Sequence, residues 1–281
     1  MTSRLRNNFS APFAKLIIVS TLLFVMAGNV APARQKNSGA TAGRAAGILL
    51  LAHGGNQKWN DEVKKLAAEI DRDTPVEIAF GMASKRTIQP AIDRLVARGV
   101  REIVAVPLFI SSHSPIITST QYLLGLRDSA PPQLAAFARM DHSQGAHHEG
   151  AASAESFDPT TPVKSSVPIR MTSALDRHPI VAEILLSRAQ SISRNPEREA
   201  VIVVAHGPVS DEDNERWLAD MGALAEPMRR AGKFKRVEYM TVRDDAPESI
   251  RSKATAELRG RVEAATKDGY QVLIVPLLLS Y

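Results

Sequence analysis

LLLAHGG, at Leu49–Gly55, returns in the second half of the chain as VVAHGP, at Val203–Pro208. In both places an aliphatic run ends in Ala-His-Gly and leads into a polar segment. An aliphatic run of this kind is typical of a strand buried on both faces of a parallel sheet, and the glycine indicates a turn after it. The repeat therefore divides the chain into two related α/β modules. It places one histidine, His53 or His206, at the same point in each.

Strands and helices alternate along both modules. Apolar runs predict strands at 47–52, 76–80, 102–110 and 167–171 in the first module and at 200–205, 236–241 and 271–279 in the second. Helical spacing of apolar residues predicts helices at 56–70, 89–97, 116–126, 178–192, 211–230 and 248–267. This alternation favours right-handed crossovers and a parallel sheet in each module. We expect the second module to be incomplete, because it has no counterpart of the elements after the third strand of the first module.

The start of the chain differs in composition from the modules. Basic residues precede the apolar run Leu16–Ala27, and Ala31-Pro32-Ala33 resembles a cleavage site, so we expect a signal peptide and export. An uncleaved membrane anchor is the alternative, but the apolar run is short for a span, and we expect no stable membrane span after cleavage. The expected domains are a signal peptide (1–33), a flexible linker (34–46), a first module (47–195) with a loop insertion (127–166) and an incomplete second module (196–281).

Composition limits the classes of function. The 281 residues suit two ordinary domains, and the formal charge is +5. Three of those charges lie in the expected signal peptide, and the remainder is too small to indicate a nucleic-acid partner. The chain has no cysteine, which excludes disulfides, thiolate metal ligands and cysteine nucleophiles. An anionic small molecule is a ligand compatible with this charge. The composition does not decide whether the chain forms a homo-oligomer.

Two histidines are expected at one edge of the first sheet. His53 ends the first strand, and His113, within FISSHSP (109–115), follows the third. In open α/β sheets ligands bind beyond the carboxyl ends of the strands, so the two imidazoles are expected to converge on one bound species. Neutral imidazole binds first-row transition metals and takes up protons near neutral pH. The alternative for His53 alone is a turn histidine bonded to backbone.

The glycines that follow His53 do not form a nucleotide site. The chain has neither the P-loop nor the dinucleotide fingerprint after a strand, nor a nucleophile elbow, so no nucleotide cofactor is expected. Gly54 and Gly55 are turn residues or, functionally, leave room for a large ligand to approach the backbone. Trp59 and Trp217, in the helices after the two repeats, are expected to pack in the core or at an interface.

Several stretches together resemble a known family. LLLAHGG, VEIAF (76–80), AIDRLVARGVREIVAVPLFISSHS (91–114) and LDRHPIVAEILLSRA (175–189) are similar to the sirohydrochlorin cobaltochelatases, the small class II chelatases related in fold to ferrochelatase. The resemblance covers most of 47–195 and, weakly, 200–281. It implies two flavodoxin-like modules, each a parallel sheet with helices on both faces. It also implies insertion of a divalent metal, usually cobalt, into a tetrapyrrole without nucleotide.

The resemblance also implies roles for single residues. His53 and His113 match the two histidines that hold the metal and accept pyrrole protons in the family. Candidate contacts to the carboxylates of the ring are Lys85 and Arg86, which we expect in the loop after the second strand, and Ser111 and Ser112 beside His113. Solvated surface charge is the alternative for the two basic residues.

The chain departs from the family in three respects. Gly81 and Met82 stand where many relatives carry an acidic residue, and His113 lies two residues closer to the strand proline. The second module keeps His206 but no counterpart of His113, so we expect a degenerate second site.

The insertion carries His142, His147 and His148, either a metal-collecting loop or incidental histidines in a linker. Two further hypotheses therefore stay open: a non-catalytic exported protein that binds or delivers metal, and a chelatase for iron or nickel.

Overall fold

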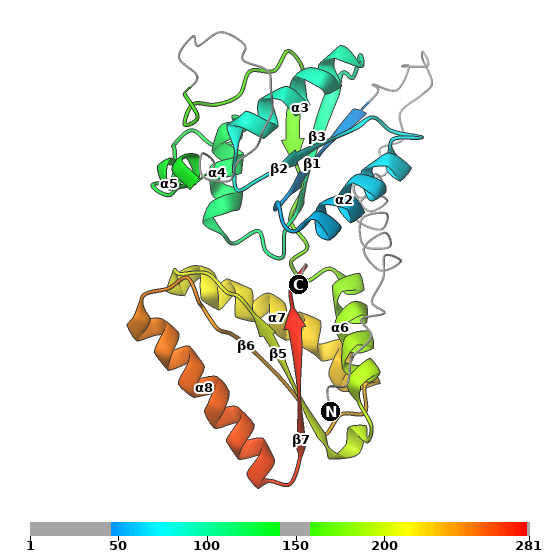
Figure 1. Ribbon diagram of the computed structural model, residues 1–281, viewed down its shortest axis with the longest axis vertical. Helices are drawn as coiled ribbons and strands as arrows, with labels where there is room; N and C mark the ends of the chain where they lie inside the picture. Colours follow the sequence, from blue (N-terminus) through cyan, green and yellow to red (C-terminus); the bar gives the residue numbers. More distant parts are fainter. Residues whose placement is uncertain (1–45, 141–157, 280–281) are drawn as a thin grey trace, which may run out of the picture.

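The computed structural model describes residues 46–140 and 158–279, which form two α/β modules (Figure 1). The first contains β1 (Ala46–Ala52), α2 (Gln57–Ile70), β2 (Val76–Phe80), α3 (Lys85–Ala97), β3 (Glu102–Leu108), α4 (Pro115–Leu123), α5 (Leu134–Met140) and β4 (Ile169–Met171). The rest comprises α6 (Pro179–Ile192), a 3-10 turn (Pro196–Arg198), β5 (Glu199–Ala205), α7 (Asp211–Ala231), β6 (Arg236–Thr241), α8 (Glu248–Lys267) and β7 (Gln271–Leu277). No helix in these ranges is long and apolar enough to cross a membrane. The predicted signal peptide and most of the linker lie outside the described residues.

All strand pairs are parallel, as the alternation predicts. The first sheet has the order β2-β1-β3-β4, and the second has the order β6-β5-β7. In the first sheet Ala52 pairs with both Phe80 and Leu108, so the three strands end level with one another. In the second, Ala205 pairs with Thr241 and Leu277 in the same way. Each Ala-His-Gly turn therefore leaves the central strand of its sheet.

The first sheet is covered on both faces because consecutive strand residues point in opposite directions. On one face Ile48 and Leu50 pack with Val63 and Leu66 of α2. On the other face Leu49 and Leu51 pack with helix residues Ile88, Ile92 and Leu95 of α3 and Leu123 of α4. This two-sided burial explains the continuous aliphatic run of β1 and confirms the predicted α/β fold.

The carboxyl ends of the two sheets face each other. In Figure 1 the arrow of β4 points toward the second module and the arrow of β7 points toward the first. An apolar cavity lies between the modules, and its walls include Leu108 and Ile110 after β3 and Leu277 at the end of β7. One hydrophobic cluster also contains residues of both sheets, so the modules share part of their core.

Two segments differ from the sequence prediction. The helix α6, predicted as the last element of the first module, packs against α7 and β7, and Arg188 donates from Nη1 to the carbonyl of Pro276 at 2.8 Å. Within the predicted loop insertion, residues 134–140 form α5, with Leu134 buried against the first sheet. Residues near 163 are also fixed, because the Val163 amide donates to the Leu123 carbonyl. The sequence patterns missed α5 because seven residues are too few to establish helical periodicity.

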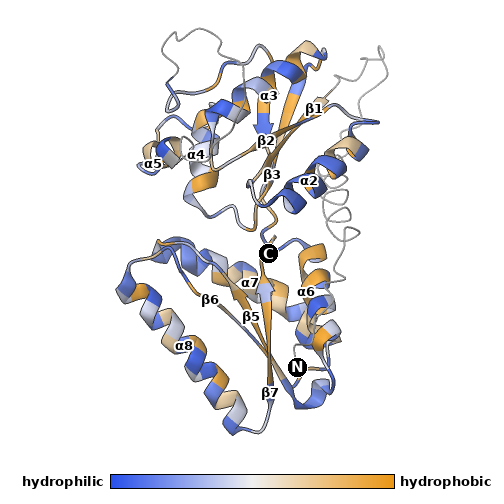
Figure 2. Cartoon of the chain, viewed as in Figure 1, coloured by the Kyte–Doolittle hydropathy of each residue, from blue (hydrophilic) through white to orange (hydrophobic). Residues whose placement is uncertain are grey.

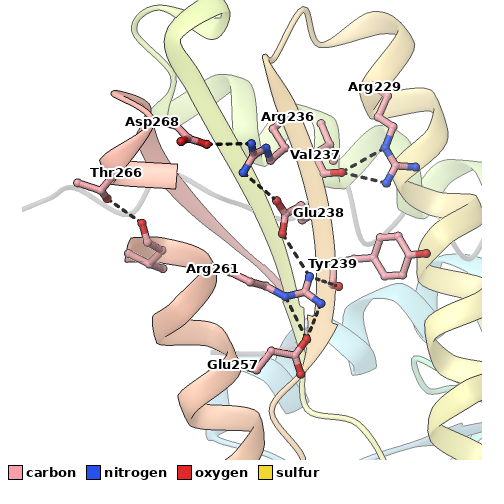
Figure 3. Close-up of polar contacts among 10 residues, drawn as sticks. Arg229, Arg236, Val237, Glu238, Tyr239, Glu257, Arg261, Thr266 and Asp268 are labelled. Atoms are coloured by element: carbon pink, nitrogen blue, oxygen red, sulfur yellow. Dashed lines mark hydrogen bonds and ion pairs between the residues drawn. The ribbon is translucent and has the colours of Figure 1, made fainter. Parts of the chain in front are cut away.

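The outer helix of the second module is held mainly by polar contacts. Its only fully buried residues are two alanines, Ala254 and Ala265, and Figure 2 shows α8 far less apolar than β5, β7 and α6. Figure 3 shows Arg261 of α8 contacting Glu257, Glu238 and the Tyr239 carbonyl, which lies 3.1 Å from Nη1. Even exposed ion pairs stabilise a fold by only about 0.2–1 kcal/mol each, and these pairs are partly exposed. We infer that α8 is the least firmly packed helix of this module.

A buried carboxylate fixes the turn before β5. Glu199 is 1% exposed, and its oxygens accept from the Ser193 hydroxyl at 2.5 Å and from the amides of Arg194 and Asn195 at 2.8 and 2.9 Å. Burial by itself would raise the pKa of this carboxyl. The three hydrogen bonds outweigh burial and hold the pKa below its usual range.

Glu199→Gln is expected to lower the free energy of unfolding by about 1–3 kcal/mol at pH 7, because buried donors lose a charged acceptor. The folded-state pKa lies below the ordinary value of 4.5, so the unfolded chain takes up this proton first. The stabilisation is therefore complete above that pH and is lost as the pH falls below it. Urea unfolding at several pH values should show the difference from wild type shrinking under acid conditions. The exposed Glu197→Gln is the control, and an equal loss there would contradict the assignment.

Candidate functional site

His53 lies on the exposed turn that follows the central strand of the first sheet. Its Nδ1 is 2.5 Å from the Gly54 carbonyl oxygen, so with Nδ1 protonated the lone pair is left on Nε2. The Trp59 indole donates to the His53 carbonyl at 2.8 Å, and Asn56 caps α2 by accepting from the Trp59 amide. The turn is thus tied to the first turn of α2, while the imidazole edge stays accessible.

His113 lies on the loop after β3, the strand next to β1. Its amide donates to the buried Ser111 hydroxyl at 3.0 Å. Asp176 fixes the neighbouring Ser112 by accepting from its amide at 2.6 Å and from its hydroxyl at 2.8 Å. The predicted contact residues Ser111 and Ser112 therefore hold the shape of the loop that carries His113.

Helix α7 of the second module also contacts this loop. The Trp217 indole donates to the His113 carbonyl at 2.7 Å, as Trp59 does to that of His53. One turn later along α7, Oδ2 of Asp220 is 3.8 Å from Nε2 of His113. Both tryptophans are predicted from the sequence only as packing residues, and Asp220 is not predicted at all. Helical periodicity does not indicate which distant loop a helix side chain meets.

Asp220 is in an unusual electrostatic environment. Its side chain is 16% exposed, and Oδ2 is buried without a hydrogen-bond partner. Burial raises the pKa of this carboxyl, and the negative charge of Asp176 raises it further, while His113 and Arg177 act in the opposite direction. An unpaired buried carboxylate oxygen is costly in a folded protein, so it is a feature that calls for an explanation.

The two predicted histidines lie on turns that leave adjacent strands at the same edge. The His53 ring meets the ring of Phe109, which directly follows β3, edge-on with centroids 6.5 Å apart. Within residues 46–140 and 158–279, no three His, Asp or Glu side chains lie close enough together to hold a metal ion. The edge therefore offers separate nitrogen and oxygen donors rather than a closed metal cage.

The cavity between the modules opens beside these donors. Its volume is about 90 Å³. Its apolar walls come from α2, the end of β3, α6 and the end of β7; they include Trp59, Leu66, Ile110, Val181, Leu185 and Leu278. Trp59 links this wall to the His53 turn, because its indole donates to the His53 carbonyl.

The remaining predicted contacts are placed differently. Lys85 and Arg86 lie in the first turn of α3 rather than in a loop, because the helix begins four residues earlier than its apolar spacing predicts. The Lys85 ammonium donates to the Asp158 carbonyl and the Thr161 hydroxyl, so it holds the segment around residue 160. Packing against Trp59 explains the glycine at position 55, because a Cβ there would lie 2.8 Å from Cδ1 of Trp59. A Cβ on Gly54 would meet nothing nearer than 3.9 Å.

His206 repeats the local geometry of His53. Its Nδ1 is 2.7 Å from the Gly207 carbonyl oxygen, and its Nε2 lies 3.3 Å from Asp244 and 3.2 Å from Asp245. The two carboxylates occupy the side of the ring that His53 leaves open. The insertion residues His142, His147 and His148 lie outside the described residues.

Comparisons with known proteins identify the family of this chain. A sirohydrochlorin cobaltochelatase from Methanothermobacter thermautotrophicus is 33% identical over 87 residues, which cover 30% of this chain and 61% of that relative. SirB from Bacillus subtilis, solved with Fe3+, has a similar fold, with a TM-score of 0.54 at 20% identity, covering 84% of this chain and 77% of SirB. A multi-domain protein from Deinococcus radiodurans, described as structurally similar to chelatases, has a TM-score of 0.44 at 15% identity, covering 83% and 51%. The model of the CbiX family matches residues 47–192. Because this match spans more than half of the chain, the protein belongs to the CbiX family.

Proposed function

We propose that this protein inserts a divalent metal into a sirohydrochlorin-type tetrapyrrole without a nucleotide. The observation that carries the proposal is the pair of histidines, His53 and His113, on the turns that leave adjacent parallel strands at one edge. Membership of the CbiX family supports it, as does the methanogen relative, which is a sirohydrochlorin cobaltochelatase. The aligned part spans less than two thirds of that relative, so the activity is our proposal for this chain.

The chemistry of insertion suits two imidazoles. Metallation replaces two inner N–H protons of the ring by one M²⁺ ion, so charge balances and no energy source is consumed. A neutral imidazole binds the ion through one lone pair, and after the ion has moved to the ring nitrogens the same lone pair accepts a proton. His53 suits the first role because its side chain is exposed and its Nδ1 faces the Gly54 carbonyl, which leaves Nε2 for the ion. The protons then pass to water at the open mouth of the cavity.

The apolar cavity suits the apolar edge of a tetrapyrrole ring. Its walls would cover an edge of the flat macrocycle, whereas the ring's carboxylates would stay at the solvent-exposed mouth. A large ligand bound there would contact both modules, because the walls come from both. We therefore expect substrate binding to depend on the second module as well as the first.

Cobalt is the metal we propose. The support is that the methanogen relative is a cobaltochelatase, while SirB was solved with Fe3+. Imidazole does not discriminate strongly among cobalt, nickel and iron, so geometry and supply decide the outcome.

The test is an anaerobic absorbance assay in which the full chain and sirohydrochlorin receive Co²⁺, Fe²⁺, Ni²⁺ or Zn²⁺ in turn. We expect the largest acceleration over the protein-free reaction with Co²⁺. A larger acceleration with Fe²⁺ or Ni²⁺ would overturn the choice of metal but leave the reaction type standing.

A further inference from the structure

The second module places a buried carboxylate oxygen beside His113. Asp220 lies on α7, and its Oδ2 is fully buried, makes no hydrogen bond and is 3.8 Å from Nε2 of His113. At that separation the two atoms are too far apart for a direct hydrogen bond. Oδ2 of Asp220 and Nε2 of His113 therefore approach each other without a hydrogen bond between them.

The surroundings of this oxygen favour a positive ion. Asp176, which already accepts two hydrogen bonds from Ser112, adds a second negative charge nearby. Arg177 and His113 are the positive or ionisable groups that face Asp220. A buried carboxylate that lacks a hydrogen bond is stabilised by a paired charge or by a metal ion.

The distance itself fits a shared cation. Nitrogen and oxygen ligands lie about 2.0–2.2 Å from a divalent transition metal, so two ligands of one ion are at most about 4.4 Å apart. The 3.8 Å between Oδ2 and Nε2 falls inside that limit. We infer that Asp220 is a carboxylate ligand for the incoming metal, supplied by the second module and shared with His113.

The helix that carries Asp220 is fixed against the same loop. Trp217, three residues earlier and therefore on the same side of α7, donates its indole N–H to the His113 carbonyl. The carboxylate is thus held in place before the metal arrives.

This assignment rests on the proposed function, because it names a ligand of the same site, but it is tested with metal alone. Co²⁺ is titrated into the full chain without tetrapyrrole, and binding is followed by calorimetry and by the visible absorption of the ion. We expect Asp220→Asn to bind Co²⁺ at least about 10-fold more weakly, since even the outer-shell partners of metal ligands contribute that much to affinity, and the exposed Glu215→Gln on the same helix to bind as wild type does.

Thermal unfolding without metal separates a ligand role from a purely structural one. The amide of Asp220→Asn is nearly the same size and shape as the carboxyl, so as a ligand variant it should unfold at or above the wild-type temperature and still lose Co²⁺ affinity. A purely structural role predicts instead a lower unfolding temperature. If that variant does not fold, Asp220→Ala replaces it in the same titration. Wild-type affinity in a folded variant would overturn the assignment.

The two proposals can fail separately. If the wild-type chain binds Co²⁺ through Asp220 but metallates no ring, the proposed function fails and the ligand assignment stands. If ring metallation requires His113 but Asp220→Asn leaves Co²⁺ affinity unchanged, the ligand assignment fails and the proposed function stands.

Discussion

His113→Ala and His53→Ala are each expected to lower the rate of Co²⁺ insertion into sirohydrochlorin by at least about 100-fold. Each substitution removes a side chain that we propose as metal ligand and proton acceptor, and a positioned acid or base alone contributes about 10²–10⁴-fold to a rate. The measurement is the initial rate of the absorbance change at saturating ring concentration. Circular dichroism of each variant checks that the fold is retained.

The repeated motif supplies the matched control. His206 sits on the same kind of turn, but Asp244 and Asp245 flank its Nε2, and residues 199–279, which contain the strands of its sheet and the turns after them, hold no second histidine. His206→Ala should therefore keep a rate close to that of the wild-type chain. A loss as large as that of His53→Ala would mean that the second edge takes part in the reaction.

Leu185→Ala is expected to lower the free energy of unfolding by about 2–5 kcal/mol. Leu185 is fully buried on α6, and it lines the cavity between the modules. Removing its side chain deletes buried apolar contacts and enlarges a space that the two modules share. Urea unfolding followed by circular dichroism measures the change.

Ile192→Ala on the same helix is the control for that prediction. Ile192 is 48% exposed, so its truncation should change the free energy of unfolding by less than about 0.5 kcal/mol. Because one hydrophobic cluster contains residues of both sheets, we also expect a single cooperative transition for the chain. A loss below about 1 kcal/mol for Leu185→Ala would contradict the packing of α6 against α7 and β7.

Local patterns predicted most of the fold. The strand of residues 76–80, the strand of residues 236–241 and the helix of residues 248–267 have the predicted bounds, because apolar runs and helical spacing are properties of the segments themselves. The rule that ligands bind beyond the carboxyl ends of parallel strands selects His53 and His113 from the sequence alone. Their common edge is confirmed, whereas their roles remain predictions.

Long-range contacts account for the features that the sequence did not predict. The apolar face of α6 indicates that this helix is buried on one side, but it does not indicate against which sheet. In the structure α6 packs against α7 and β7. Trp217 and Asp220 are more than 100 positions from His113, and no local pattern joins them to it. Lys85 is predicted as a contact for an anion, yet it donates to the Asp158 carbonyl, in a segment 73 positions away.

The most direct test compares the full chain with the double variant His53→Ala/His113→Ala in one anaerobic assay with sirohydrochlorin and Co²⁺. We expect the wild-type chain to accelerate the absorbance change of ring metallation well above the protein-free rate, and the double variant to give the protein-free rate. No acceleration by the wild-type chain, or equal acceleration by the folded double variant, would contradict metal insertion at this histidine edge.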